Sequence, residues 1–135
     1  MTVSIITVCY NSESTIEQTI QSVISQRFQN IEYIIVDGGS KDQTLSIIEK
    51  YNSQIDVLIS EKDKGIYDAI NKGIKLATGD VIGFLHSDDI FKSSDILKRV
   101  SDSFNRDIDL IYGDIEYVDK EDLSKVIRKW SSKDY

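Results

Sequence analysis

The chain has 135 residues, of which 16 are Lys or Arg and 23 are Asp or Glu, so its formal net charge is -7. This length suits one domain with a single core, and the acidic balance disfavours nonspecific binding to nucleic acid or anionic lipid. A single cysteine, Cys9, excludes an internal disulfide and a multi-cysteine zinc site. An anionic small molecule bound with a divalent cation remains compatible with this charge.

Short β-rich runs alternate with segments of helical periodicity along most of the chain. Strands are predicted at 3–8, 31–36, 57–60 and 81–85, with a fifth beginning at 110–112, and helices at 16–24, 42–51, 66–77 and 96–104. Ser14 and Glu17 form a capping-box pattern before the first helix, and Asp42 is placed to cap the second. Residues 81–85 are apolar without alternation, which predicts a strand covered on both faces.

This alternation predicts an α/β fold with a mostly parallel, Rossmann-like sheet flanked by helices and with ligands bound at the carboxyl ends of its strands. Residues 115–118 and 126–130 flank a charged turn and are typical of an antiparallel hairpin. We expect one domain over 1–135, with an α/β part at 1–114 and the hairpin part at 115–135. We also expect the chain to be the first part of a longer protein.

Polar groups gather where the predicted strands end, at 9–11, 37–40, 61–63, 87–89 and 113–114. Four of these five groups contain a carboxylate, and such a concentration of charge is costly unless a cation or hydrogen-bond donors share it. Mg²⁺ or Mn²⁺ held by one or two carboxylates and by nucleotide phosphates would offset the repulsion. The alternative for any single aspartate is that it caps a helix or a turn.

Two common phosphate-binding motifs are absent from the sequence. No Gly-x-Gly-x-x-Gly follows the first strand and no Gly-x4-Gly-Lys-Ser/Thr occurs anywhere, which argues against a dinucleotide-binding Rossmann enzyme and a P-loop NTPase. The pair Asp88 and Asp89 directly follows an apolar strand. Adjacent carboxylates in a turn can diverge, so that one binds a metal while the other accepts from a sugar hydroxyl.

Four ordered blocks, at 3–11, 36–44, 65–74 and 77–89, resemble the family 2 glycosyltransferases, and 112–114 resembles a further block of bacterial surface-polysaccharide members. The resemblance implies a GT-A fold and inverting transfer from a nucleotide-sugar, a UDP-sugar, to a saccharide or lipid-linked acceptor in bacterial polysaccharide biosynthesis. It also implies Mn²⁺ or Mg²⁺ as cofactor. The implied location is cytoplasmic, at the inner face of the plasma membrane, with peripheral membrane association through a part beyond Tyr135.

The resemblance also implies roles for individual carboxylates. By position, Asp37 matches the aspartate that hydrogen-bonds the base of the donor, and Asp88 with Asp89 matches the metal-binding motif. A carboxylate can accept from the imide N–H of uracil, and a cation beside the diphosphate can neutralise the charge that develops on the leaving group. Asp89 would bind the metal, while Asp88 would face the ribose or sugar at the same metal site.

Four further residues are expected to contact the donor. Tyr10 and Asn11 lie on the turn expected beneath the nucleoside, where an aromatic face can support a base, although Tyr10 could equally belong to the core. Asp63 and Asn71 belong to the third block, where Asp63 is expected to contact the donor and Asn71 to order the loop around it.

Several other reactive residue types are expected to have structural roles. Asp68 and Lys72 are four residues apart on a predicted helix and are expected to form a surface ion pair. His86 is expected to pack or to position the metal motif rather than to act as a general base. Cys9 is expected to be a buried, inert thiol.

Inverting transfer needs a base that removes the proton of the acceptor hydroxyl. In the family this aspartate lies well beyond the metal motif, and none of Asp114, Glu116 or Asp119 matches its motif, so the base is expected beyond Tyr135. The alternative is a non-catalytic nucleotide-sugar binding fragment that lacks the base. A receiver or flavin-binding domain is a third possibility, but the Asp-Gly-Gly-Ser-x-Asp run at 37–42 argues against it.

Overall fold

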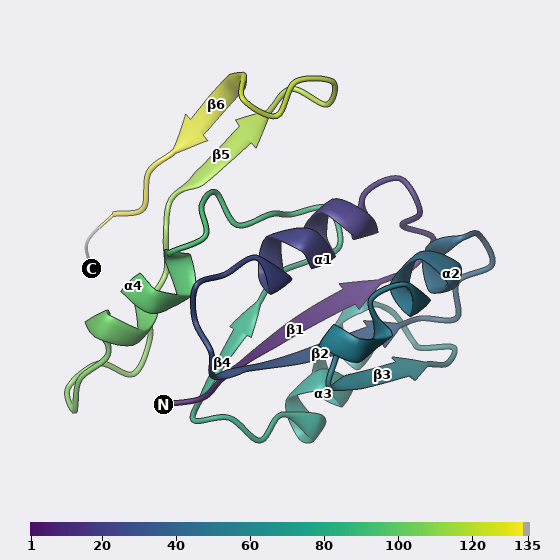
Figure 1. Ribbon diagram of the computed structural model, residues 1–135, viewed down its shortest axis with the longest axis horizontal. Helices are drawn as coiled ribbons and strands as arrows, with labels where there is room; N and C mark the ends of the chain where they lie inside the picture. Colours follow the sequence, from purple (N-terminus) through teal and green to yellow (C-terminus); the bar gives the residue numbers. More distant parts are fainter. Residues whose placement is uncertain (134–135) are drawn as a thin grey trace. The chain divides into compact units, whose positions relative to one another are not determined.

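The computed structural model describes residues 1–133, and the chain divides into two compact units, Met1–Asp102 and Ser103–Tyr135. The first unit contains a four-stranded parallel sheet of order β3-β2-β1-β4 (Figure 1). Its strands are β1 (Val3–Cys9), β2 (Ile31–Asp37), β3 (Val57–Ser60) and β4 (Val81–Phe84). The helices are α1 (Ile16–Ile24), α2 (Thr44–Glu49), α3 (Ile66–Leu76) and α4 (Ile96–Ser103), with a 3-10 turn η1 (Asn52–Gln54) after α2.

The register of the sheet brings the carboxyl ends of three strands together. Cys9 at the end of β1 lies opposite Asp37 at the end of β2, and Asp37 lies opposite Ser60 at the end of β3. On the other side of β1, β4 pairs only as far as Phe84 opposite Ile6. Cys9, Asp37 and Ser60 therefore mark the carboxyl edge of the sheet, which is where parallel α/β folds bind ligands.

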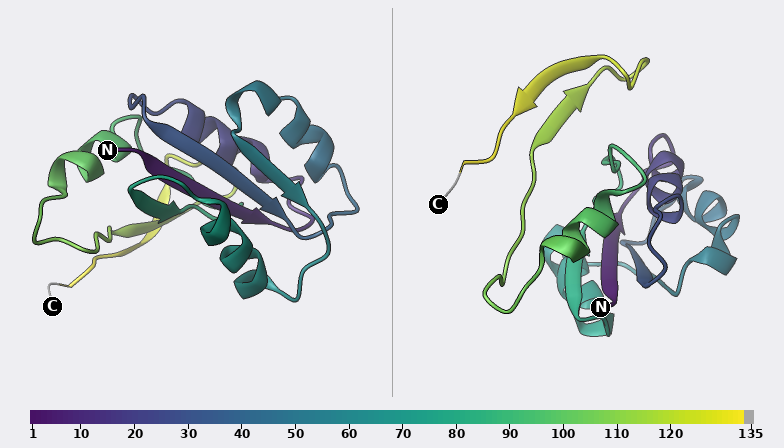
Figure 2. Two further views of the ribbon diagram at one scale, coloured as in Figure 1. Left: turned by 90° about the horizontal axis from the view of Figure 1, so that it is seen from below. Right: turned by 60° about the vertical axis from the view of Figure 1, so that its left-hand side comes forward.

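The sheet is covered on both faces by helices, as the alternation of strands and helices predicts (Figure 2). Successive side chains of a strand point to opposite faces, so Ile5 packs in a core cluster with residues of α1, α2 and α4, including Ile20 and Leu97. Ile6 packs in a second cluster with Ala69 of α3. All seven residues of β1 are buried, which makes this strand the centre of the fold.

The prediction that residues 81–85 are covered on both faces is wrong for this unit. β4 is an edge strand, and its burial alternates, with Ile82 exposed and Phe84 46% exposed. The helix on that side, α3, packs against β1 and β2. The apolar run therefore predicted the strand correctly, but it did not predict that the helix layer leaves one face of this strand uncovered.

Two predicted helix starts turn out differently. The prediction of a capping box at Ser14 and Glu17 is wrong, because α1 begins at Ile16 without a side-chain cap. The backbone N–H groups of Thr15 and Ile16 donate instead to the carbonyl of Ser12, at 3.1 and 2.9 Å, so a backbone acceptor replaces the serine hydroxyl. Glu17 is used elsewhere and accepts from the hydroxyl of Tyr51 at 2.8 Å.

The second helix is shorter than predicted, and its N-cap is Gln43, without a side-chain cap hydrogen bond; the preceding residue, Asp42, binds the first helical residue instead. Its Oδ1 accepts from the backbone N–H of Thr44 at 2.9 Å and from the Thr44 hydroxyl at 2.6 Å. α2 then ends at Glu49, and the chain continues through η1 to β3. The predicted end near residue 51 was therefore too far along the chain, since the last turn has become 3-10.

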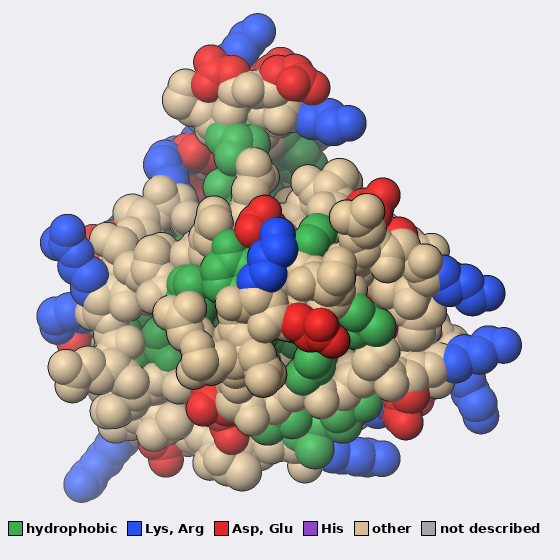
Figure 3. Space-filling model, turned by 45° about the vertical axis from the view of Figure 1, so that its right-hand side comes forward, with side chains coloured by type: hydrophobic (Ala, Val, Ile, Leu, Met, Phe, Trp, Pro, Cys, Tyr) green, Lys and Arg blue, Asp and Glu red, His purple; other side chains and the backbone are tan. Residues whose placement is uncertain are grey.

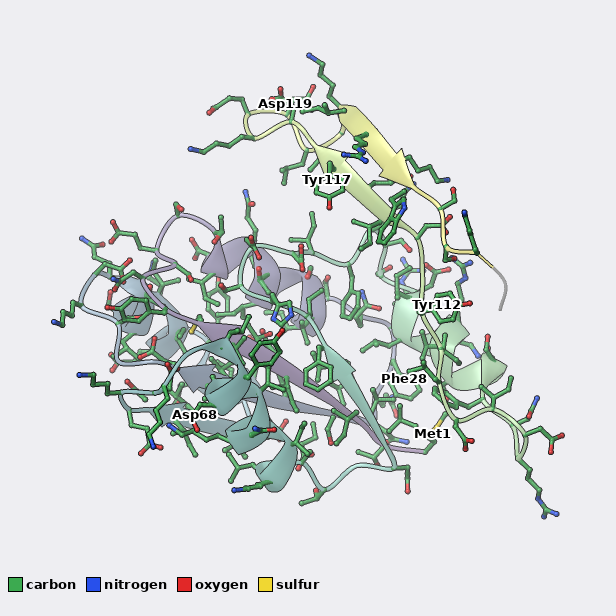
Figure 4. The ribbon with its side chains drawn as sticks, turned by 180° about the vertical axis from the view of Figure 1, so that it is seen from behind. Met1, Phe28, Asp68, Tyr112, Tyr117 and Asp119 are labelled. Carbon is green, nitrogen blue, oxygen red and sulfur yellow. The ribbon has the colours of Figure 1, made fainter. Side chains whose placement is uncertain are left out.

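The second unit contains the predicted hairpin, formed by β5 (Ile115–Val118) and β6 (Val126–Trp130) in antiparallel pairing. Tyr117 lies on β5 and Asp119 follows it (Figure 4), and Asp119 Oδ1 closes the turn by accepting from the N–H groups of Glu121 and Asp122 at 2.9 and 3.1 Å. Among residues 1–133, no helix is long and apolar enough to cross a membrane.

The predicted fifth strand at 110–112 is wrong. These residues belong to no strand among those described, and Leu110 is 75% exposed. Tyr112 is tied down by its side chain, whose hydroxyl donates to the carbonyl of Lys133 at 2.7 Å. A strand forms only where a neighbouring strand offers an edge for pairing, and an apolar run of three residues does not by itself provide a partner strand.

Glu32 joins three segments at the amino end of the sheet. Its carboxylate accepts from the backbone N–H and the hydroxyl of Thr78, at 2.8 and 2.7 Å, and from the hydroxyl of Ser4. Burial opposes ionisation, but the hydrogen bonds from Ser4 and Thr78 outweigh it and hold the pKa of this carboxyl below its ordinary value. The turn between α3 and β4 is thereby attached to β1 and β2.

We expect Glu32→Gln to destabilise the fold at about pH 7, by roughly 1 kcal/mol after solvent screening of this partly exposed group. A carboxyl whose pKa is lowered by folding stabilises the protein above its unfolded-state pKa, and this contribution is lost as the pH falls through the folded-state pKa. Thermal unfolding of the two proteins should therefore differ at neutral pH and converge as the pH falls through the folded-state pKa of Glu32. Glu49→Gln, on the exposed side of α2, is the matched control and should not show this pH dependence.

Candidate functional site

A cleft of about 480 Å³ opens at the carboxyl edge of the sheet. Three segments form its walls: the end of β1 with the turn into α1, the loop before α3 with the first turn of that helix, and the residues that follow β4. Its lining residues are Val8, Cys9, Tyr10, Asn11, Ser12, Ser14, Thr15, Asp63, Gly65, Ile66, Ala69, His86, Ser87 and Asp88. The cleft therefore lies where the strand ends predicted a ligand site.

Asp37 organises this edge from within the protein. Its side chain is completely buried, and its carboxylate accepts from the backbone N–H groups of Gly39 and Ser40 at 3.0 and 2.9 Å. The hydroxyls of Ser40 and Ser60 also donate to it, the latter at 2.8 Å, as does the thiol of Cys9 at 3.6 Å. One buried charge is thus satisfied by donors from β1, from β3 and from the turn after β2.

The turns after β1 and β2 are locked to each other. Gly39 has a φ of +84° and approaches the backbone of Lys62 closely, a conformation that favours glycine. Asn11 also has a positive φ, of 48°; its N–H donates to the Ser40 hydroxyl at 2.8 Å, and its Oδ1 accepts from the N–H of Lys41 at 2.9 Å. Asn11 therefore holds the shape of the cleft wall that it lines.

The turn after β1 presents an aromatic side chain to solvent. Tyr10 is 57% exposed and lines the cleft, so it does not belong to the core. Next to it, the hydroxyl of Ser12 lies 2.9 Å from the hydroxyl of Ser87, which joins this turn to the loop after β4. Neither serine was singled out from the sequence, although Ser12 directly follows Asn11 and Ser87 directly precedes the acidic pair.

The acidic pair after β4 is held by backbone contacts. The N–H of Asp89 donates to the carbonyl of His86 at 3.0 Å, and the carbonyl of Asp89 accepts from the Thr19 hydroxyl at 2.8 Å. Burial, and then the neighbouring charge of Asp88, raise the pKa of Asp89. Asp88 lines the cleft, whereas Asp89 is not among the lining residues.

The acidic pair can accommodate a divalent cation as part of a ligand set. Among the residues described, no three His, Cys, Asp or Glu side chains come together as a complete metal site. Mg²⁺ typically uses one or two protein carboxylates and takes its other ligands from water and phosphates, so Asp88 and Asp89 fit such a partial set. A bound cation would offset the repulsion between these two carboxylates, which adds to the larger effect of burial in raising the pKa of Asp89.

His86 and Cys9 both lie at the base of the cleft. The Nδ1 atom of His86 is buried and has no hydrogen-bond partner within residues 1–133. Burial, followed by the charge of Asp37 and the hydrogen bond to it, raises the pKa of the Cys9 thiol far above its ordinary range. Cys9 is thus the buried, inert thiol that the sequence predicts.

The third block contributes one carboxylate to the cleft. Asp63 is half-buried and lines it, while Asn71 is exposed on α3 and is not among the lining residues. Asp68, labelled on α3 in Figure 4, and Lys72 form the predicted ion pair, at 3.3 Å, and Lys72 also pairs with Glu61 at 3.1 Å.

The structure thus brings part of the predicted donor-binding set together. Tyr10, Asn11, Asp63 and Asp88 line one cleft, and Asp37 lies behind its wall. The roles predicted for them, and for Asn71 and Asp89, remain predictions. On the face drawn in Figure 3, basic side chains are spread among acidic ones and do not gather into one basic patch.

Asp114, Glu116 and Asp119, the three carboxylates that do not match the motif of the base, all lie in the second unit. Asp114 Oδ1 accepts from the N–H and the hydroxyl of Ser132, at 2.9 and 3.0 Å, and Lys129 lies 3.8 Å from Asp114 and 4.0 Å from Glu116. These contacts are internal to the hairpin unit. The prediction that the base lies elsewhere in a longer protein stays a prediction.

Comparison with solved structures supports the GT-A fold. The chain superposes on Staphylococcus aureus TarS, residues 1–349, in complex with UDP-GlcNAc with a TM-score of 0.69 and 32% identity, over 76% of this chain and 30% of that one. It also superposes on the Pyrobaculum calidifontis mannosyltransferase PcManGT, in complex with GDP-Man and Mn²⁺, with a TM-score of 0.66 and 24% identity, over 70% of this chain and 30% of that one. The second likeness concerns the fold alone.

Curated relatives are longer than this chain. It is 37% identical over 105 residues to an uncharacterized glycosyltransferase of Mycobacterium tuberculosis strain H37Rv, covering 77% of this chain and 40% of that protein. It is 35% identical over 122 residues to the Escherichia coli UDP-Glc:alpha-D-GlcNAc-diphosphoundecaprenol beta-1,3-glucosyltransferase WfgD, covering 90% of this chain and 48% of that protein. The chain therefore spans less than half the length of these relatives.

The family model described as Glycosyl transferase family 2 matches residues 4–135, which is nearly the whole chain. The four sequence blocks, the parallel sheet with its cleft at the carboxyl edge, and the superposition on TarS agree with this match. The chain belongs to glycosyl transferase family 2.

Proposed function

We propose that this chain binds the nucleotide-sugar donor, a UDP-sugar, of an inverting glycosyltransferase. The observation that carries the proposal is the cleft at the carboxyl edge of the sheet, with an exposed aromatic ring, Tyr10, on one wall and the acidic pair, Asp88 and Asp89, beside the other. UDP-GlcNAc is bound by TarS, which is 32% identical to this chain. A UDP-sugar is therefore the donor that we infer.

Each wall of the cleft suits a different part of the donor. Tyr10 offers an aromatic face for the base, and Asn11 holds the turn on which that face is presented. Asp88, which lines the cleft, is proposed to accept from a ribose or sugar hydroxyl. Asn71 on α3 is proposed to order the loop around the bound donor.

The diphosphate would lie next to Asp88 and Asp89, whose charges alone would repel it. Mg²⁺ or Mn²⁺ held by these two carboxylates would offset the negative charge that develops on the leaving diphosphate. The carboxylate of Asp89 would be the direct ligand, and the hydrogen bond from Thr19 to its backbone fixes the loop that carries it.

The acceptor is proposed to be a saccharide or a lipid-linked saccharide of a bacterial surface polysaccharide. By its name, the relative WfgD acts on a diphosphoundecaprenol-linked sugar. Inverting transfer to such an acceptor requires a base near its hydroxyl, and we propose that this base is supplied by a part of the enzyme outside this chain.

The donor and metal proposals predict that UDP binds more tightly in the presence of Mn²⁺. Asp89→Asn should weaken UDP binding in Mn²⁺ by about tenfold or more, equivalent to about 1.4 kcal/mol, because a neutral amide is a poor ligand for a divalent cation. Isothermal titration calorimetry with UDP, with and without Mn²⁺, measures this difference.

The matched control is Asp102→Asn, which removes the same charge on α4, where Asp102 pairs with Lys98 at 2.8 Å. It should leave UDP binding and its dependence on Mn²⁺ as in the parent chain. UDP affinity that is unaffected by Mn²⁺ and by Asp89→Asn would contradict the proposed metal site.

Asp89→Asn should also make the metal-free chain more stable at about pH 7. A carboxyl whose pKa is raised by folding destabilises the folded state progressively as the pH rises from its unfolded-state pKa through its folded-state pKa, and the amide lacks this penalty. The gain in melting temperature should disappear at about pH 3, where the carboxyl is protonated in both states. A gain that persists at low pH would point to packing rather than charge.

A binding module that lacks the catalytic base is the competing function. Donor hydrolysis and sugar transfer should be measured for this chain and for a longer protein that contains it. Transfer by this chain alone would contradict the proposal that the base lies outside it, whereas UDP binding without transfer in either protein would favour the binding module.

A further inference from the structure

The segment between β4 and α4, residues 85–95, carries the acidic pair but contains neither a helix nor a strand. Its backbone groups therefore have no partners in a helix or a sheet, and a backbone N–H or C=O group that leaves water without a partner is costly. Partners for several of these groups come from one face of α1 and from the turn that follows this helix.

The first two partners are hydroxyls of α1. Thr19, which is fully buried, donates its hydroxyl to the carbonyl of Asp89 at 2.8 Å. Three residues further along the helix, the hydroxyl of Ser22 donates to the carbonyl of Thr19 at 2.8 Å and accepts from the N–H of Phe91 at 3.2 Å. Two successive side chains on one face of α1 thus hold two alternate residues of the segment.

Gln26 makes the third contact and extends the row to α4. Its side chain is 8% exposed, and its Nε2 atom donates to the carbonyls of Ser22 and Ser93 at 3.1 and 2.7 Å. Its Oε1 atom accepts from the N–H of Leu97, in the first turn of α4, at 3.0 Å. Loss of this amide would therefore leave several polar groups of the backbone without a partner.

We propose that Thr19, Ser22 and Gln26, the polar row of α1, are positioning residues that hold Asp89 in place for a divalent cation. None of the three is among the residues that line the cleft, and all three bond backbone groups instead. Groups that orient a metal ligand raise the affinity for the ion, because the ligand does not have to be ordered when the ion binds. This inference rests on the proposed function and deepens it.

The test compares the affinity for UDP with and without Mn²⁺ in the parent chain and in two variants of Thr19. Thr19→Val keeps the shape of the side chain but removes the hydroxyl, so the enhancement of UDP binding by Mn²⁺ should fall by about tenfold. UDP binding without metal should stay at the parent's value. Thr19→Ser keeps the hydroxyl and should restore most of the enhancement, as measured by isothermal titration calorimetry.

Amide hydrogen exchange of the chain without metal or UDP gives a readout that is independent of binding. In Thr19→Val, the amides of Asp89 and Phe91 should exchange about tenfold faster than in the parent, because local opening of the segment becomes easier. The amides of the buried strand β1 should keep the parent's exchange rates. Faster exchange throughout the chain would indicate global destabilisation and would contradict a local positioning role.

Two further variants remove members of the polar row that do not contact the acidic pair. Ser22→Ala and Gln26→Met should both lower the enhancement by Mn²⁺ and speed the exchange of the Phe91 amide. Ser22→Ala changes the packing least, so it decides this point if Gln26→Met does not fold. The parent's enhancement and exchange rates in Ser22→Ala would contradict the action of the row as a unit.

Thr7→Val is the matched control, because it removes a buried hydroxyl that lies 3.1 Å from the hydroxyl of Tyr33 rather than at the segment. It should lower the melting temperature and keep the parent's enhancement by Mn²⁺. The inference is overturned if Thr19→Val keeps the parent's enhancement, or if Thr7→Val loses as much of it. Absence of any Mn²⁺ effect in the parent would overturn the proposed metal site as well, whereas an effect that survives in Thr19→Val overturns this inference alone.

Discussion

The buried carboxylate of Asp37 is the interaction on which the shape of the ligand edge depends. It ends β2, the strand that lies between β1 and β3, and it receives donors from Cys9, from Ser60 and from the turn at Gly39 and Ser40. A charge buried in this way is stable only while its donors stay in place. The hydrogen bonds that compensate the charge of Asp37 therefore also fix the ends of three neighbouring strands and the turn after β2. These segments determine the shape of the cleft.

The layered architecture was predictable because it follows from local periodicity. Short β-rich runs and helical periodicity identified the four strands of the sheet, the helices between them and the hairpin at 115–118 and 126–130. The errors arose where the outcome depends on partners distant in sequence. The segment 110–112 found no edge to pair with, the Ser12 carbonyl replaced the Ser14 hydroxyl at α1, and the edge position of β4 left Phe84 exposed.

The site was predictable in outline but not in the direction that each side chain faces. Parallel strands bring their carboxyl ends to one edge whatever the side chains are, so Tyr10, Asn11, Asp63 and Asp88 were expected near one another before any coordinates. The direction that each acid faces depends on the space around it. Asp37 is turned inward by donors from three segments, and the room for Asp63 comes from the missing side chain of Gly38, a relation between residues that spacing along the chain does not encode.

The two carboxylates on this edge of the sheet, Asp37 and Asp63, have different surroundings. Asp37 is buried at the end of a central strand, where it accepts hydrogen bonds from three segments. Asp63 lies in the loop before α3 and accepts from one backbone N–H, that of Gly65. Asp63 makes none of the hydrogen bonds to Asp37 that join β1, β2 and β3. A loop that is tied to the scaffold by so few contacts can vary in sequence while the buried end of the sheet keeps its stability.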